Sequence, residues 1–307
     1  MEKIHFLHRN LQPSVSCSSK GISSTMPKHK IKVGIIGGSG LDDLAKHILR
    51  EETEVKPQPD SLFEFPSTKV TQGTIDGVPV AIILRHGEGH RISPSNVNYR
   101  ANIESLKSIG CTHILATTAC GSLIESISPG ELVIPDSFID RTHLRKSTFF
   151  DGTAPQYAGV CHVPMEPAFH PRTSKILVQA GKELGMSLKH GATIVTIEGP
   201  RFSSKAESKA FQLWGGHLVN MTTCPEVMLA KEAGILYASI AMATDYDCWR
   251  ESDKSVCVAD VMKVFKENVN KVTTVLVKAI KLIGEQNWDE DIENLKKLVT
   301  EGIVSKR

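Results

Sequence analysis

Short apolar runs alternate along the chain with segments whose apolar residues recur every three or four positions. Continuous apolar runs of this length are typical of strands that are buried on both faces. Such runs occupy residues 31–36, 113–117, 192–197 and 236–244, with shorter ones at 132–134 and 219–223. The helical spacing recurs at residues 96–109, 172–184, 204–214 and 258–283. Because strands and helices alternate, we predict an α/β fold with a mixed or mostly parallel central sheet flanked by helices.

A hairpin and a long loop complete this pattern. Residues 68–76 alternate in polarity, Gly77 supplies a turn, and residues 78–84 form a second strand. Residues 140–170 are rich in Pro, His, Gly and aromatic residues and lack periodicity, which is typical of a functional loop or a partner contact. No internal repeat or linker follows residue 31. We therefore predict one domain over residues 31–285, with residues 286–307 completing it or contacting another subunit.

The first thirty residues differ from the rest of the chain. They contain Ser-rich segments and several basic residues, but only one acid, Glu2. Two interpretations stay open, a disordered extension ahead of an internal start at Met26 and a weak targeting peptide. Arginine occurs there only at Arg9 and no long amphipathic stretch is present, so we expect a disordered extension over residues 1–30.

Composition narrows the class of protein. Apolar residues make up 40% of the chain and charged residues 23%, and the net charge is only +2, which favours neither nucleic acid nor a membrane surface as a partner. No apolar run reaches the roughly 20 residues of a membrane span. The seven cysteines are odd in number and contain no C-x-x-C pair, which argues against a disulfide framework or a zinc site. We expect a reducing compartment, the cytoplasm with the nucleus as a second location.

Candidate chemistry gathers where predicted strands end. Ligands of open α/β sheets bind beyond the carboxyl ends of the strands. Five such ends carry small or polar residues, namely G-G-S-G after Ile36, R-H-G after Leu84, T-T-A-C-G-S after Ala116, M-T-T after Asn220 and T-D-Y-D after Ala243. We expect these ends to converge on one site.

Two of these strand ends, G-G-S-G and R-H-G, contain groups that can bind an anion. Backbone N–H groups and the Ser39 hydroxyl of the first loop can hold a phosphate, although a tight strand-to-helix turn explains the glycines equally well. Arg85 can grip a phosphate with two donors, and His86 adds another, but a solvated polar loop also fits. His90 completes an H-x-x-x-H spacing. Metal binding through that spacing needs a helix, which the intervening glycines disfavour.

Asp245 and Asp247 follow a strongly apolar strand. Two carboxylates beside a buried strand are removed from water, and this costs folding free energy unless they are paired, hydrogen-bonded or used in a reaction. An exposed turn with helix-capping aspartates is the alternative.

Six motifs in consistent order resemble the trimeric purine nucleoside phosphorylase family. They are I-G-G-S-G, L-R-H-G-E-G-H, T-T-A-C-G-S-L, T-I-E-G-P-R-F-S-S, N-M-T-T-C-P-E-V and A-T-D-Y-D-C-W, and the likeness spans about residues 31–285. The resemblance implies a nucleoside phosphorylase fold with a barrel-like mixed sheet, a homotrimer and no metal or organic cofactor. It also implies a salvage reaction in which 5′-methylthioadenosine and phosphate give adenine and 5-methylthioribose 1-phosphate, with phosphate as co-substrate.

The same resemblance implies roles for individual residues. The phosphate site would consist of Ser39, Arg85, His86, Thr118, Ala119 and Thr222, with serine in place of the family's usual threonine at position 39. The nucleoside would contact Met221 at the ribose, Phe202, Asp245 and Asp247 at the purine, and His90, Val258 and Val261 at the 5′ group. His162 would reach a neighbouring subunit's site, and Val304 is the matching apolar residue near the C-terminus.

Cleavage of an N-glycosidic bond leaves a cationic sugar and an anionic purine. It therefore needs an anionic nucleophile at the anomeric carbon and a proton donor at the purine. We expect bound phosphate to be the nucleophile and Asp245, with its pKa raised by burial, to assist at N7. A carboxylate accepts from a 6-amino group and repels a 6-oxo group, which favours adenine.

Several alternatives stay open. Spacing alone lets Val258 and Val261 be ordinary core residues, and adenosine could be a secondary substrate because the 5′ group adds only a few kcal/mol of apolar burial. A 6-oxopurine nucleoside phosphorylase is the nearest rival. A non-catalytic adenine-nucleoside sensor and an NAD-dependent dehydrogenase belong to other classes.

Overall fold

The computed structural model describes residues 27–38, 53–55, 63–250 and 257–304. Nine strands form one sheet with the spatial order β10-β6-β8-β9-β5-β1-β4-β3-β2. They are β1 (Val33–Gly37), β2 (Thr53–Val55), β3 (Val70–Ile75), β4 (Val78–Leu84), β5 (His113–Ser122), β6 (Leu132–Arg141), β8 (Lys189–Ile197), β9 (Leu218–Asn220) and β10 (Leu236–Asp245). A small second sheet pairs β7 (Val160–Cys161) with β11 (Ile303–Val304).

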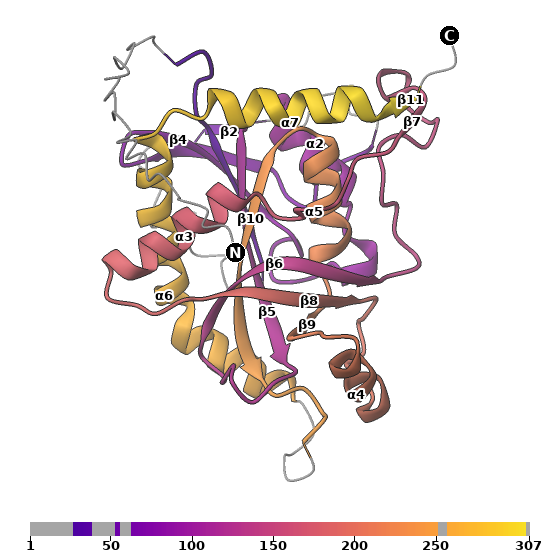
Figure 1. Ribbon diagram of the computed structural model, residues 1–307, viewed down its shortest axis with the longest axis vertical. Helices are drawn as coiled ribbons and strands as arrows, with labels where there is room; N and C mark the ends of the chain where they lie inside the picture. The colour runs from indigo at the N-terminus through magenta and orange to yellow at the C-terminus, as the bar shows by residue number, and fades with distance from the viewer. Residues whose placement is uncertain (1–26, 39–52, 56–62, 251–256, 305–307) are drawn as a thin grey trace, which may run out of the picture.

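One edge of the large sheet closes on itself. Strand β10 pairs parallel with β5 along almost its whole length and antiparallel with β6 at Ala241 and Met242. Together with the β6–β8, β8–β9 and β9–β5 pairings, this makes a closed ring of strands. The predicted α/β fold with a mixed, barrel-like sheet is therefore confirmed (Figure 1).

Helices pack on both faces of this sheet. They are α2 (Tyr99–Ser108), α3 (Pro171–Glu183), α4 (Lys205–Leu213), α5 (Thr223–Glu232), α6 (Val258–Gly284) and α7 (Asp289–Gly302). Val33 and Ile35 of β1 belong to the apolar cluster that includes α3 and α6, while Ile36 belongs to the cluster that includes α2 and α5. This alternation is what a strand buried on both faces requires.

The C-terminal segment adds a helix across one end of the molecule. Helix α7 lies over the top of the view in Figure 1, far from α4. Trp288 before it is 1% exposed, and its indole N–H donates to the Ile283 carbonyl at 2.9 Å. Trp288 and Ile292 join the same apolar cluster as α6, so this segment shares the core of the domain. None of the described helices is long and apolar enough to cross a membrane.

The predicted element types agree with the structure, but several ends differ. Strand β5 continues from the predicted end at residue 117 to Ser122, because its small residues pair with β10 as far as Gly121. Strand β6 likewise extends from residue 134 to Arg141 along β8. Strand β9 ends at Asn220 rather than at residue 223, since Thr223 already begins α5.

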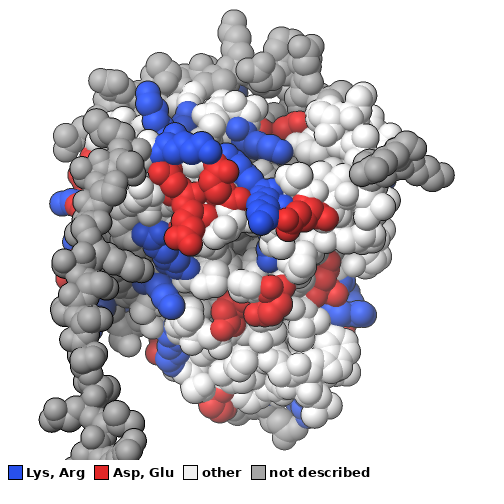
Figure 2. Space-filling view, turned by 45° about the horizontal axis from the view of Figure 1, so that its top comes forward, with Lys and Arg blue, Asp and Glu red and all other residues white. Residues whose placement is uncertain are grey.

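Charged side chains of both signs cover the surface around α7. On the face drawn in Figure 2, lysines and arginines lie interspersed with aspartates and glutamates. The part of this face that the structure describes therefore shows no broad area of a single charge, as the small net charge of +2 leads one to expect.

Candidate active site

A cavity of about 250 Å³ opens at the carboxyl ends of β4, β5, β9 and β10. This is where an α/β sheet presents its ligand site. Its polar wall contains the predicted residues Arg85, His86, His90, Thr118, Ala119 and Thr222, together with Asp245 and Asp247. Its apolar wall contains Phe202, Met221, Val258 and Val261. Strand ends that lie far apart in the sequence thus converge on one cavity.

Two predicted residues, His162 and Val304, do not line the cavity, and the position of a third is not described. Ser39 lies outside the described residues, although its neighbour Gly38 lines the cavity. His162 is exposed, and its backbone N–H donates to the Gly302 carbonyl at 2.8 Å beside the small β7–β11 sheet. Val304 lies in β11 of that same sheet and is 62% exposed. These two therefore lie outside the chain's own cavity, and a contact with another subunit stays a prediction.

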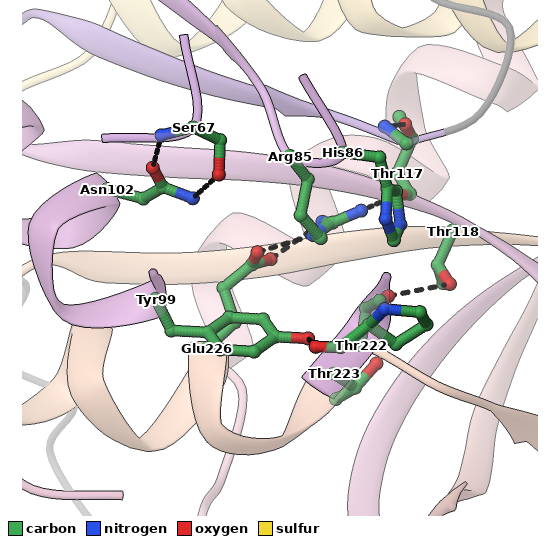
Figure 3. A network of polar contacts seen from close by, with 12 residues as sticks. Ser67, Arg85, His86, Tyr99, Asn102, Thr117, Thr118, Thr222, Thr223 and Glu226 are labelled. Atoms are coloured by element: carbon green, nitrogen blue, oxygen red, sulfur yellow. Dashed lines mark hydrogen bonds and ion pairs between the residues drawn. The ribbon is translucent and has the colours of Figure 1, made fainter. Parts of the chain in front are cut away.

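Arg85 is the buried cation of the site. Its side chain is 2% exposed and its Nε donates to Oε2 of Glu226 at 2.6 Å, while Nη2 donates to Oε1 at 2.8 Å (Figure 3). A third donor, Nη1, contacts the Thr117 carbonyl at 3.0 Å. Burial disfavours the charged guanidinium, but the Glu226 carboxylate outweighs this and raises the pKa of Arg85. The arginine is therefore charged, and its plane is fixed.

The packing around Arg85 depends on a glycine. A Cβ at Gly38 would stand 2.9 Å from the Thr117 carbonyl oxygen and 3.2 Å from Nη1 of Arg85. The backbone N–H of Gly38 itself donates to the Thr117 hydroxyl at 3.1 Å. A side chain at this position would force Gly38 away from the Thr117 carbonyl and the arginine.

His86 is neutral in this environment. Burial, followed by the neighbouring charge of Arg85, lowers the pKa of His86 to about 3. Its Nδ1 lies 2.9 Å from the Ile92 carbonyl oxygen, which can only accept, so Nδ1 carries the proton. The other nitrogen, Nε2, is therefore an acceptor. The ring also stacks on His90 at a centroid distance of 4.2 Å.

A buried amide organises the hydroxyls of the site. Nδ2 of Asn220 donates to the hydroxyl oxygens of Thr118 at 3.0 Å and Thr223 at 2.8 Å, while its Oδ1 accepts from Thr196 at 3.0 Å. The Thr118 and Thr222 hydroxyl oxygens lie 3.4 Å apart. The Thr118 hydroxyl itself donates to the Ala119 carbonyl at 3.2 Å, and it would turn from that carbonyl to donate to an anion.

The two aspartates lie together at the end of β10. Oδ1 of Asp245 accepts from the Asp247 backbone N–H at 2.7 Å, and its Oδ2 accepts from the Thr244 hydroxyl at 2.8 Å. Within the described residues, Oδ2 of Asp247 is buried without a hydrogen-bond partner. Burial raises the pKa of both carboxyls. Asp247 is thus buried and Asp245 is half-buried, so the exposed-turn alternative is wrong.

Small residues make room for this pair. A Cβ at Gly121 would stand 3.1 Å from Oδ1 of Asp245 and 3.1 Å from the Asp247 Cβ. At Gly199, whose φ is +69°, a Cβ would meet the Met221 sulfur at 2.6 Å. These glycines explain why T-A-C-G-S and E-G-P-R-F pack so closely against the site.

Some residues of the site had no predicted role. Glu226 and Asn220 hold Arg85 and Thr118, and Met262 adds to the apolar wall. Arg145, from the long middle loop, donates to the Met221 and Cys224 carbonyls at 2.7 Å each and to Oε1 of Glu198 at 3.0 Å. An acid inside the apolar start of α5 was the one available signal for Glu226, since such a charge must be paired.

We looked for a metal site among the residues that the structure describes. Among the residues that the structure describes, no group of three or more His, Cys, Asp or Glu side chains is placed to hold a metal ion. His86 and His90 face each other as stacked rings rather than as paired ligands.

The sequence matches a known family over most of its length. The model of the phosphorylase superfamily matches residues 32–281. The chain belongs to the phosphorylase superfamily. Within this superfamily, S-methyl-5'-thioadenosine phosphorylase of Drosophila melanogaster is 54% identical over 275 residues, covering 90% of this chain and 94% of the relative. The same enzyme of Xenopus tropicalis is 53% identical over 270 residues, covering 88% and 95%.

Solved structures of the superfamily agree with the fold. Methylthioadenosine phosphorylase from Schistosoma mansoni in complex with adenine has a TM-score of 0.83 and 42% identity, covering 89% of this chain and 99% of that one. A mutant of adenosine/methylthioadenosine phosphorylase from the same organism, in complex with methylthioadenosine, has the same TM-score of 0.83, 42% identity and the same coverage of 89% and 99%. The superfamily membership therefore rests on both sequence and fold.

Proposed function

We propose that this chain is a pentosyltransferase that cleaves 5′-methylthioadenosine with phosphate, giving adenine and 5-methylthioribose 1-phosphate. Relatives at 53–54% identity are S-methyl-5'-thioadenosine phosphorylases, and a structure at 42% identity is in complex with methylthioadenosine. The observation that carries the proposal is one cavity with a buried arginine and two hydroxyls at one side and two carboxyls, the half-buried Asp245 and the buried Asp247, at the other. Phosphate is a co-substrate, and we propose no metal or organic cofactor.

Phosphate would bind between Arg85, Thr118 and Thr222. The arginine supplies charge-assisted hydrogen bonds and the threonines supply hydroxyl donors. His86 contributes an acceptor at Nε2, which suits the single O–H of monohydrogen phosphate. The backbone of Ala119 and the hydroxyl of Ser39 complete the proposed set. Bound in this way, phosphate can attack the anomeric carbon as the sugar becomes cationic.

The purine would lie against Phe202, with its N7 and 6-amino edge toward the aspartates. Protonated Asp245 would donate to N7 as the glycosidic bond breaks, which neutralises the leaving purine. Asp247 has the buried acceptor Oδ2 that a 6-amino group can fill. A 6-oxopurine would leave that acceptor facing another acceptor, and this disfavours the rival 6-oxopurine activity.

The sugar and its 5′ group would lie along the apolar wall. Met221 would contact the ribose, while His90, Val258 and Val261 would surround the methylthio group. The valines of this wall would exclude water from the sugar and offer a 5′ hydroxyl no hydrogen-bond partner. Adenosine is therefore proposed as a secondary substrate.

The assembly and the location of the protein are also proposals. We propose a homotrimer in which His162 reaches a neighbouring subunit's cavity. The exposed position of His162, outside its own cavity, supports such a contact. The cytoplasm, with the nucleus as a second compartment, is the proposed location.

The test is adenine release from 5′-methylthioadenosine with and without phosphate, beside adenosine and inosine. We expect phosphate-dependent release that is fastest with 5′-methylthioadenosine and slowest with inosine. Release from inosine at a similar rate would support the 6-oxopurine rival. Binding of the nucleoside without any release would support a sensor and contradict the proposal.

A further inference from the structure

We infer that Glu226 is a positioning residue that holds the guanidinium plane of Arg85 toward bound phosphate. Arg85 and Glu226 are 141 positions apart in the sequence, and each is 1% exposed. The inference rests on the proposed phosphate-dependent function. It assigns Glu226 no contact with the substrate.

The geometry leaves a defined pair of donors. A guanidinium has five N–H groups. Glu226 accepts from Nε at 2.6 Å and from Nη2 at 2.8 Å, and the Thr117 carbonyl accepts from Nη1 at 3.0 Å. One N–H on each of Nη1 and Nη2 remains. A plane fixed by three hydrogen bonds presents these two donors at a constant angle, as a two-pronged contact with phosphate oxygens requires.

Glu226 is itself held from a second strand. The Tyr237 hydroxyl of β10 donates to Oε1 of Glu226 at 2.8 Å. Arg85 follows β4 and Tyr237 lies in β10, while Glu226 itself lies in α5. The Glu226 side chain is therefore held by its own helix and by partners at two strands. Figure 3 shows the Glu226 carboxylate turned toward the Arg85 guanidinium. In such a dry setting, water cannot take the place of a missing partner.

A purely electrostatic role and a positioning role of Glu226 predict opposite changes in phosphate affinity when its carboxylate is replaced. A neutral side chain at position 226 would leave Arg85 with its full positive charge, and that would favour phosphate binding. Glutamine, however, offers an N–H₂ group where a carboxylate oxygen now accepts, so the guanidinium must lose a hydrogen bond and move. The direction of the change in phosphate affinity therefore separates a positioning role from a purely electrostatic one.

The experiment compares Glu226→Gln with Glu232→Gln. Glu232 lies on the same helix and is also buried, but it binds the Thr148 hydroxyl and the Phe149 backbone, away from Arg85. We expect Glu226→Gln to raise the KM for phosphate about tenfold, which corresponds to one lost charge-assisted hydrogen bond. The KM for 5′-methylthioadenosine at saturating phosphate should stay within about twofold. Glu232→Gln should change neither KM.

A second readout does not depend on turnover. Phosphate should raise the Tm of the wild type and of Glu232→Gln, and this increase should be smaller for Glu226→Gln. If Glu226→Gln does not fold, Tyr237→Phe replaces it. We expect Tyr237→Phe to raise the KM for phosphate by a smaller factor and to leave the KM for 5′-methylthioadenosine unchanged. A lower phosphate KM, or equal changes in both KM values, would overturn the inference. Wild-type adenine release without phosphate would instead overturn the proposed function.

Discussion

At the scale of single residues, environment assigns the roles. Asp245 and Asp247 are chemically identical, yet both oxygens of Asp245 accept hydrogen bonds while one oxygen of Asp247 has none among the described residues. The same distinction separates Arg85, which has a carboxylate partner, from His86, which is neutral beside that arginine. Partners and burial, rather than residue type, decide what each group can do.

Replacement of Asp245 by Asn should remove a proton donor while keeping the shape of the site. We expect Asp245→Asn to lower kcat for 5′-methylthioadenosine by about 10² or more, with little change in the KM for phosphate. An amide can also donate to a 6-oxo group, so relative activity toward inosine should rise. Steady-state assays of adenine and hypoxanthine release measure both effects. An unchanged kcat would rule out the proton donor, and an unchanged substrate preference would show that Asp245 has no part in the selectivity and leave it to Asp247.

Asp247 should make stability depend on pH. Burial raises the pKa of this carboxyl in the folded protein, so the folded state binds more protons than the unfolded state between the two pKa values. The contribution of Asp247 to stability is therefore present below the ordinary carboxyl pKa and is lost as pH rises through the raised value. The stability of Asp247→Asn minus that of the wild type should therefore be more favourable at pH 7.5 than at pH 4.5. Thermal unfolding without ligand measures this difference, and a difference independent of pH would contradict it.

At the scale of elements, the ends of strands matter more than their middles. Strand β5 carries the core residues Ile114, Ala116 and Cys120, and its last part, still paired with β10, contributes Thr118, Ala119 and Gly121 to the cavity. Helix α5 begins beside the end of β5, and Cys224 in its first turn breaks the helical geometry with φ −98° and ψ 133°. The kink lets Thr222 face the cavity while Glu226 reaches Arg85 from behind.

Trp288 joins α7 to the rest of the core. Its ring packs edge-on against His113 at 4.5 Å, and the Arg172 guanidinium lies 4.0 Å above it. We expect Trp288→Ala to lower the free energy of unfolding by about 3–5 kcal/mol, through the cavity it leaves. Trp214→Ala is the matched control, because Trp214 is 50% exposed, and it should cost about 0.5 kcal/mol or less. Denaturant unfolding measures both, and equal effects would show that α7 is not part of the cooperative core.

At the scale of the whole molecule, closure of the sheet assembles the site. Strands β4, β5, β9 and β10 come from widely separated parts of the chain, and their carboxyl ends meet because β10 inserts between β5 and β6. The small β7–β11 sheet ties the long middle loop to the C-terminus and leaves His162 exposed. A partner subunit is the proposed destination of that side chain.

The proposed trimer has a direct test. A single chain has a mass of 33.6 kDa, and native mass measurement should give about three times that value. If His162 completes a neighbour's site, His162→Ala should raise the KM for 5′-methylthioadenosine without changing the mass of the assembly. A monomer with full activity would contradict both statements.

Much of the fold and most of the site were predictable from local sequence. A short apolar run such as 236–244 favours a buried strand, and helical spacing marks 258–283 clearly. The residues Arg85, Thr118 and Asp245 follow strands, so the rule for α/β sheets places them at a ligand site. The exact ends of β5 and β6 were less predictable, because pairing with a distant strand, not local preference, extends them. Strand β9 ends early because α5 begins at Thr223.

The sequence by itself determined the order of strands and helices and the side chains at each strand end, because periodicity and polarity are local properties. Only the tertiary structure decided which of these groups meet. The ion pair of Arg85 with Glu226, the acceptor state of His86 Nε2 and the unfilled oxygen of Asp247 all depend on contacts that local patterns do not encode. Burial then sets their charge, because the cost of removing a group from water depends on every neighbour that the fold brings to it.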